Sequence, residues 1–143
     1  MKIAIANDHG GFEYKEAIKK HLIKLGHTVI DEGTNSKDSC HYPFFAKKAA
    51  KDLISHKVER IVLICTTGEG IMMSANRYKG VRVGVGYNDE VAKLMRQHND
   101  ANGIAFGQKF MDLDDCIKRL NIFLNTPFEG GRHLIRVKMI DEE

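Results

Sequence analysis

The residue types with the clearest chemical potential lie in one glycine-containing segment, Cys65-Thr66-Thr67-Gly68-Glu69-Gly70. Cys65 ends an apolar run and precedes an expected helix, whose N-terminus favours a thiolate. A thiolate there can act as a nucleophile or as a base that removes a proton. Gly68 and Gly70 let backbone N–H groups turn inward, and such a loop binds an anion or a developing oxyanion. A plain strand-to-helix turn with a buried, inert cysteine is the competing interpretation.

Acid–base and cationic side chains occur at three other points. These are Asp8 and His9, His98 and Asn99, and Arg132 and Arg136. The two arginines are four residues apart on one face of an expected helix, a spacing that suits a phosphate group. Turn formation, helix capping and a solvated helix face are the alternative interpretations of these three pairs.

Short apolar runs alternate with amphipathic stretches along the chain, which predicts βαβ units and a parallel sheet. The expected strands are Lys2–Ala6, Thr28–Asp31, Arg60–Cys65, Val81–Gly86 and Gly103–Phe106. The expected helices are Phe12–Leu25, Pro43–Ile54, Ile71–Tyr78, Asp89–Gln97 and Leu113–Leu124. Ligands of such sheets bind beyond the carboxyl ends of the strands. We therefore expect the segment after Cys65 to share one edge with Asp8, His9, His98 and Asn99.

The segment after Pro127 differs from the rest of the chain. Gly130-Gly131 leads into a cationic stretch that predicts a helical arm, and we expect residues 127–143 to dock on a neighbouring subunit. No linker or repeat interrupts the preceding pattern, so residues 1–143 are predicted to form a single domain.

Composition narrows the class of function. The chain has 143 residues, and its 22 basic and 19 acidic side chains are interleaved, which argues against a nucleic-acid surface. Three widely spaced cysteines without a CxxC pair make a poor disulfide framework and a poor zinc site. No signal peptide or membrane-spanning run is visible, so we expect a cytoplasmic protein without membrane contact.

Four separated motifs together resemble a known family. They are Asp8-His9-Gly10-Gly11, the Cys65–Gly70 loop followed by Ala75-Asn76-Arg77, the segment His98-Asn99-Asp100-Ala101-Asn102, and Thr126-Pro127-Phe128-Glu129-Gly130-Gly131-Arg132-His133. In this order and spacing they look like type B ribose-5-phosphate isomerase. The wider family also contains galactose-6-phosphate and allose-6-phosphate isomerases.

The resemblance implies a doubly wound α/β fold of Rossmann or flavodoxin-like type, with a five-stranded parallel sheet, helices on both faces and a C-terminal helical arm. It implies a homodimer or tetramer with active sites between subunits. The implied reaction interconverts ribose 5-phosphate and ribulose 5-phosphate through a cis-enediol, as in the pentose phosphate pathway. Neither a metal nor a cofactor is implied.

The resemblance also implies roles for individual residues. Cys65 matches the base that moves a proton between C1 and C2, Thr67 a hydroxyl that assists it, and His98 the group that opens the furanose ring. Among the substrate-binding positions, the anion hole matches Thr66, Gly68, Glu69 and Gly70, and the sugar contacts match Asp8, His9 and Asn99. The phosphate clamp matches Arg132 and Arg136. Lys109 matches a substrate-binding position at which the family commonly has arginine. The clamp is supplied partly by a neighbouring chain in the family.

Three departures bear on the substrate. Thr66 stands where the family usually has glycine, and His41-Tyr42-Pro43-Phe44 replaces the usual Asp-Tyr-Pro-Asp, closer to one galactose-6-phosphate isomerase subunit. Glu69 occupies a variable position of the loop. A hexose-6-phosphate isomerase acting on galactose or allose phosphate is therefore the nearest alternative. A non-catalytic sugar-phosphate-binding protein, or a receiver-type signalling domain that shares the architecture alone, is a more distant one.

Overall fold

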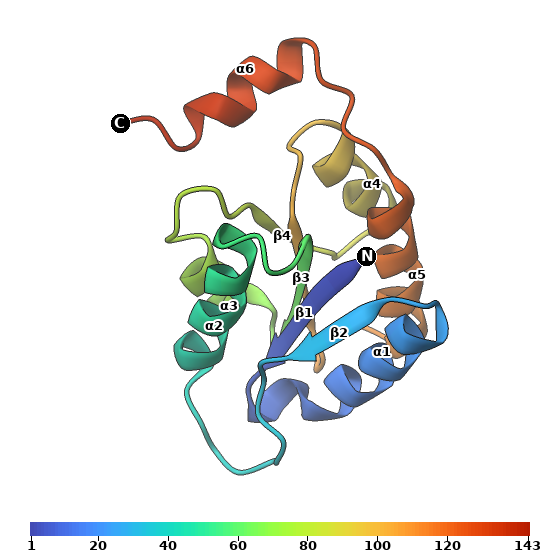
Figure 1. The fold of residues 1–143 in the computed structure, drawn as a ribbon. Coiled ribbons are helices and arrows are strands. Elements are labelled where there is room, and N and C mark those ends of the chain that lie inside the picture. The colour runs from blue at the N-terminus through green and yellow to red at the C-terminus, as the bar shows by residue number, and fades with distance from the viewer.

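A five-stranded parallel sheet forms the centre of the computed structural model, which describes all of residues 1–143. Its strands are β1 (Lys2–Asn7), β2 (Thr28–Asp31), β3 (Arg60–Cys65), β4 (Val83–Val85) and β5 (Gly103–Gly107). They lie in the order β2-β1-β3-β5-β4 (Figure 1). The predicted doubly wound parallel sheet is thus confirmed, and β5 separates β3 from β4, unlike the flavodoxin order 2-1-3-4-5.

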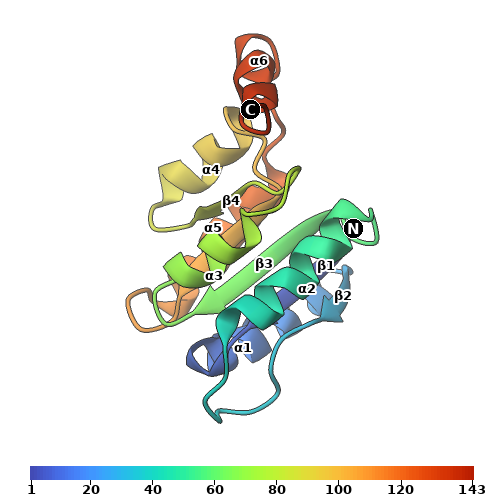
Figure 2. The same ribbon diagram turned by 90° about the vertical axis from the view of Figure 1, so that its left-hand side faces the viewer.

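Helices cover both faces of the sheet (Figure 2). The helices on one face are α1 (Phe12–Lys24), α4 (Asp89–Gln97) and α5 (Leu113–Asn125), and those on the other are α2 (Tyr42–Ile54) and α3 (Glu69–Ala75). A short 3₁₀ turn, η1 (His9–Gly11), links β1 to α1. Because both faces are covered, all but the first residue of β3 are buried, which explains its unbroken apolar sequence.

The two faces of β1 carry side chains of different size. Ala4 and Ala6 face α2, which meets them with alanines of its own. Ile3 and Ile5 point to the opposite face, where larger side chains of α1, α4 and α5 fill the core. Successive side chains of a strand point to opposite faces of the sheet. The small side chains on one face let α2 pack close to the sheet, and the larger ones on the other face hold α1, α4 and α5 farther from it.

The chain reverses its winding direction between β1 and β3. From β1 it crosses to β2 on one side, and from β3 it continues to β4 and β5 on the other side. The carboxyl ends of these two neighbouring strands form the topological switch point, where ligands of open α/β sheets bind. The first polar loop and the Cys65 loop both leave the sheet at this point.

Some element ends differ from their predictions. Helix α3 begins at Glu69, two residues earlier than expected, directly after Gly68, whose φ of +82° turns the chain from β3 into the helix. Strand β4 is shorter than expected, since the side-chain amide of Asn76 bonds both the N–H and the C=O of Val83. That amide occupies the outer edge of β4, where a further strand would otherwise pair.

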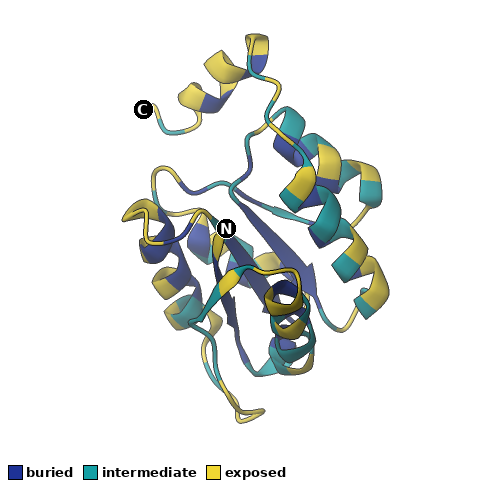
Figure 3. Ribbon diagram, turned by 45° about the vertical axis from the view of Figure 1, so that its right-hand side comes forward, coloured by how far each residue is buried: buried dark blue, intermediate teal, exposed yellow.

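The C-terminal arm forms α6 (Arg132–Met139), which lies beyond the amino ends of the strands (Figure 1). Its inner face buries His133 and Val137 against its own chain, and Asp141 accepts a 2.8 Å hydrogen bond from the Gly80 N–H. The outer face is exposed (Figure 3) and carries apolar side chains such as Leu134 and Ile135.

Candidate active site

The loops that follow β1 and β3 touch one another at the switch point. Asn7 pairs with Ile64 in the sheet register, so Asp8 and Cys65 leave the sheet side by side. The Asp8 carboxylate accepts a 2.9 Å hydrogen bond from the Gly10 N–H and caps η1. A Cβ on Gly10 would lie 2.3 Å from Thr66 Oγ1, so only glycine permits this approach.

Cys65 is buried at the end of β3, and its sulfur lies at the inner side of the loop. The Gly68 N–H donates to Cys65 Sγ at 3.1 Å, which stabilises negative charge on sulfur. Thr67 Oγ1 accepts the Glu69 N–H at 3.1 Å and leaves its own O–H free to donate. The first N–H groups of α3 follow directly from this loop, and N–H groups at a helix start are available to bind an anion.

Lys109 lies beside this loop because β5 is the next strand of the sheet. The Gln108 N–H donates to the Cys65 carbonyl at 2.9 Å, and the Lys109 N–H donates to the Thr66 carbonyl at 3.2 Å. The Lys109 side chain is exposed. Two backbone hydrogen bonds therefore hold the main chain at Lys109 against the loop.

Two residues that the sequence analysis did not assign to the site also contact it. The Cys40 N–H donates to His9 Nδ1 at 3.2 Å, so a neutral His9 carries its proton on Nε2. The Tyr42 ring packs against Gly70, where a Cβ would lie 2.8 Å from ring carbons. Tyr42 precedes the proline that opens α2, which was the one signal in the sequence that placed it near a helix start.

The remaining cysteine differs from Cys65. Cys116 is fully buried in the core between α5 and the sheet, and burial raises the pKa of its thiol to about 11. It therefore stays protonated near neutral pH. All three cysteines are free thiols.

The expectation that His98 and Asn99 gather beside Cys65 is wrong within one chain. They follow α4, and a helix that connects parallel strands runs back to the amino edge of the sheet. The Asn102 carbonyl accepts a 3.0 Å hydrogen bond from the N–H of Ile61, near the start of β3. The strand of six residues between the two edges is about 17 Å long, at about 3.3 Å per residue.

Arg132 and Arg136 lie at this amino edge as well. The Glu129 N–H donates to the Gln97 carbonyl at 3.1 Å and brings the start of the arm to the end of α4. Both arginines are exposed, and neither has a carboxylate within 4.0 Å. Their guanidinium groups are free to bind an anion such as phosphate.

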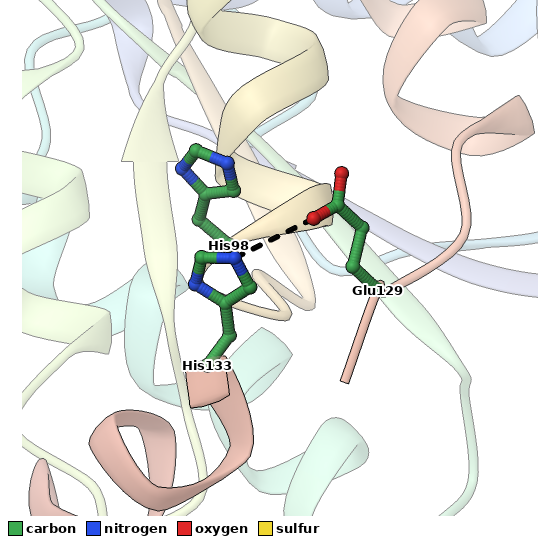
Figure 4. A group of neighbouring side chains, drawn as sticks. All are labelled: His98, Glu129 and His133. Atoms are coloured by element: carbon green, nitrogen blue, oxygen red, sulfur yellow. Dashed lines mark ion pairs between the residues drawn. The ribbon is translucent and has the colours of Figure 1, made fainter. Parts of the chain in front are cut away.

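His98 and His133 stack on one another at the amino edge, with ring centroids 4.3 Å apart and an interplanar angle of 12° (Figure 4). Glu129 Oε2 lies 3.4 Å from His133 Nε2. Burial, aided by the positive charges of His98, Arg132 and Arg136 and opposed by Glu129, holds the pKa of His133 below its usual range. The neutral form of the His133 ring is therefore favoured.

The donor atoms of His98, Glu129 and His133 lie within 4.8 Å of one another, close enough to test as a metal site. A nitrogen lone pair lies in the plane of its ring and binds Zn²⁺ at about 2.0–2.1 Å. Two parallel rings cannot both direct lone pairs at one ion from stacked planes. The stack therefore does not fit a two-histidine metal centre.

Residues 3–140 match the family model described as Ribose/Galactose Isomerase. The chain belongs to this family. Ribose-5-phosphate isomerase B of Escherichia coli is 40% identical over 139 residues, which cover 97% of this chain and 93% of the relative. The sequence resemblance to the type B isomerases is thereby confirmed.

Solved structures of this family have the same fold. Ribose-5-phosphate isomerase B of Clostridium thermocellum superposes with a TM-score of 0.98 at 42% identity, covering 99% of this chain and 96% of the other. The enzyme of Mycoplasma genitalium with bound ribulose-5-phosphate gives 0.93 at 36% identity, covering 97% and 93%. No helix of this family member is long and apolar enough to span a membrane.

Proposed function

We propose that the chain interconverts ribose 5-phosphate and ribulose 5-phosphate, in sites that two copies of the chain build together. The observation that carries the proposal is the division of the candidate residues between two edges of one sheet. The carboxyl edge holds a thiol, an anion-binding loop and sugar-binding polar groups, and the amino edge holds His98 and two unpaired arginines. A pentose phosphate is too short to reach both edges of one subunit.

The carboxyl edge supplies the bond chemistry in this proposal. The Cys65 thiolate removes the proton from C2 of open-chain ribose 5-phosphate, and the electrons of that bond form the C1–C2 double bond of an enediolate. The N–H groups of the Thr66–Gly70 loop stabilise the oxyanion, and Thr67 donates to a substrate oxygen. Transfer of a proton from the O2 hydroxyl to O1, followed by return of the Cys65 proton to C1, gives the ketose.

The partner's amino edge supplies the rest of the site. Its Arg132 and Arg136 bind the phosphate as a pair, and its His98 transfers protons when the furanose ring opens. A two-fold axis would bring each amino edge to the other subunit's carboxyl edge, which gives two equivalent sites per dimer. The exposed apolar face of α6 then has a partner surface to cover it.

Ribose 5-phosphate is favoured over a hexose 6-phosphate because the compared isomerases of known structure act on the pentose, and one contains ribulose-5-phosphate. Thr66 and His41 remain the positions at which this chain departs from the family pattern. A non-catalytic binder would need no base, whereas Cys65 keeps a hydrogen-bonded sulfur in the loop. We further propose a cytoplasmic, single-domain protein, in which the three free thiols stay reduced.

The test compares turnover of ribose 5-phosphate, allose 6-phosphate and galactose 6-phosphate by the purified protein without added metal. Fastest formation of ketose from the pentose is the expected result. Faster turnover of either hexose would move the assignment to the hexose branch of the family. Binding of all three without turnover would refute Cys65 as a base.

A further inference from the structure

We propose that His133 is a positioning residue that holds the His98 ring in the orientation needed to open the substrate's furanose. This inference rests on the proposed function, because His98 acts there in ring opening. His133 itself is not proposed to contact the sugar.

The side chain of His98 has little else to hold it. Its backbone N–H donates to the Leu94 carbonyl at 2.8 Å, but no hydrogen bond from this chain reaches either ring nitrogen. The 4.3 Å stack with His133 is therefore the contact that sets the plane of the ring (Figure 4). Both nitrogens of His98 remain free to exchange protons with a ligand.

His133 is held firmly on its own side of the stack. Its side chain is 6% exposed, and its backbone N–H donates to the Gly130 carbonyl at 3.1 Å. Its Nε2 is buried without a hydrogen-bond partner, although Glu129 Oε2 lies 3.4 Å away in a poorly aligned direction. A buried ring with an unused nitrogen serves here through its flat surface rather than through a hydrogen bond.

The charge of His133 also matters. His98 faces it from the end of α4, Arg132 and Arg136 approach from α6, and Glu129 approaches from the preceding loop. Burial and the charges of Arg132 and Arg136 favour the neutral form of His133, and two stacked imidazolium rings would repel each other. His98 can thus gain and lose a proton beside a ring that does not change its own charge.

Furanose opening breaks the C1–O4 bond, removes a proton from the O1 hydroxyl and adds one to O4. A ring held in a fixed plane can deliver the proton along the direction of the breaking bond, whereas a rotating ring delivers it only part of the time. Misplacement of a catalytic group by about 1 Å can cost about 100-fold in rate. Loss of the stack should therefore slow ring opening without affecting the later proton transfer.

The experiment separates these two steps with two substrates. Ribose 5-phosphate is a furanose that must open, whereas ribulose 5-phosphate cannot close a furanose because its C5 oxygen carries the phosphate. For His133→Ala we expect kcat on ribose 5-phosphate to fall by about 10- to 100-fold. Deuterium exchange at C1 of ribulose 5-phosphate in D₂O should stay within about twofold of wild type, on the scale of minor packing effects.

Two further variants distinguish positioning from stability. His133→Phe keeps a flat ring and should recover most of the ribose 5-phosphate rate lost in His133→Ala. Val137→Ala weakens the docking of α6 without touching the stack and should leave the ratio of the two rates unchanged. A selective loss in Val137→Ala, or an equal loss of both reactions in His133→Ala, would overturn the positioning role.

Failure of the proposed function would look different. Cys65→Ala should abolish both the conversion and the deuterium exchange, and persistence of the exchange would refute the proposed base. A Zn²⁺ titration adds an independent check on the stack, because tight binding that disappears in His133→Phe would show that the rings rearrange into a metal site. We expect no such binding.

Discussion

The two edges of the sheet are built in different ways. The carboxyl edge is held by the sheet itself, since Cys65 pairs with Gly107 in the strand register and Gly68 donates to its sulfur. The amino edge is held by few contacts between the end of α4 and the C-terminal arm, among them the Glu129–Gln97 backbone hydrogen bond and the His98–His133 stack. The carboxyl edge is suited to chemistry that depends on fixed backbone N–H donors. The C-terminal arm is suited to carrying side chains that contact a substrate bound at the carboxyl edge of another subunit. The contrast predicts that variants of the two edges fail in different ways.

The largest effect should follow removal of the Cys65 sulfur. Cys65→Ala should lower kcat by about 10³-fold or more, because general-base catalysis contributes about 10²–10⁴-fold. Ribulose 5-phosphate binding, measured by calorimetry, should stay nearly unchanged. Cys116→Ala is the matched control and should keep kcat. Substantial turnover by Cys65→Ala would assign the base to another group.

Removal of the His98 imidazole should come next. His98→Asn should slow ribose 5-phosphate turnover by about 10²-fold, since the ring must then open without a proton-transfer group. Deuterium exchange at C1 of ribulose 5-phosphate should persist, because that substrate is acyclic. Equal loss of both reactions, measured by NMR in D₂O, would place His98 in the enediolate step and remove the functional contrast between the edges.

The phosphate clamp should give a smaller effect of a different kind. Arg136→Ala should raise KM for ribose 5-phosphate by roughly 10- to 100-fold and change kcat little, since a hydrogen bond to a charged group contributes about 1.5–3 kcal/mol. Steady-state kinetics provides the measurement. The exposed Lys138→Ala on the same helix serves as the control. An unchanged KM would show that Arg136 is a solvated helix residue that does not bind the phosphate.

The smallest effect concerns pH and the arm. The pKa of His133 is lowered in the folded chain, so the unfolded chain binds its proton more tightly. The stability contributed by the neutral ring is present above the unfolded pKa of about 6.5 and is lost as the pH falls through the folded value. The hydrogen-exchange protection factors of the α6 amides, taken relative to the intrinsic exchange rate at each pH, should therefore fall below about pH 6.5. His133→Phe should show a weaker pH dependence, and an identical dependence would contradict this origin.

The sequence was most informative where local pattern and structure coincide. The run Arg60–Cys65 predicted both the buried strand and the place of the thiol, and α4 has the predicted bounds. The glycines at 68 and 70 indicated a tight turn after β3, because each is required locally: Gly68 has a positive φ, and Gly70 lies against Tyr42.

The sequence was misleading where the site depends on the direction of helices. His98 follows a helix rather than a strand, so it lies at the opposite edge from Cys65. The stack joins residues 98 and 133, which are far apart in the chain and carry no shared motif. The contacts of Cys40 and Tyr42 with the two loops likewise arise from packing across the sheet edge and left no periodic signal.

The central claim is that one active site takes Cys65 from one subunit and the arginines from its partner. The most direct measurement mixes Cys65→Ala with the double variant Arg132→Ala/Arg136→Ala, unfolds and refolds them together, and assays at low ribose 5-phosphate. Random pairing makes half of the dimers mixed, each with one intact site, so activity should recover to about a quarter of wild type. Activity no higher than the sum of the two separate variants would contradict a shared site.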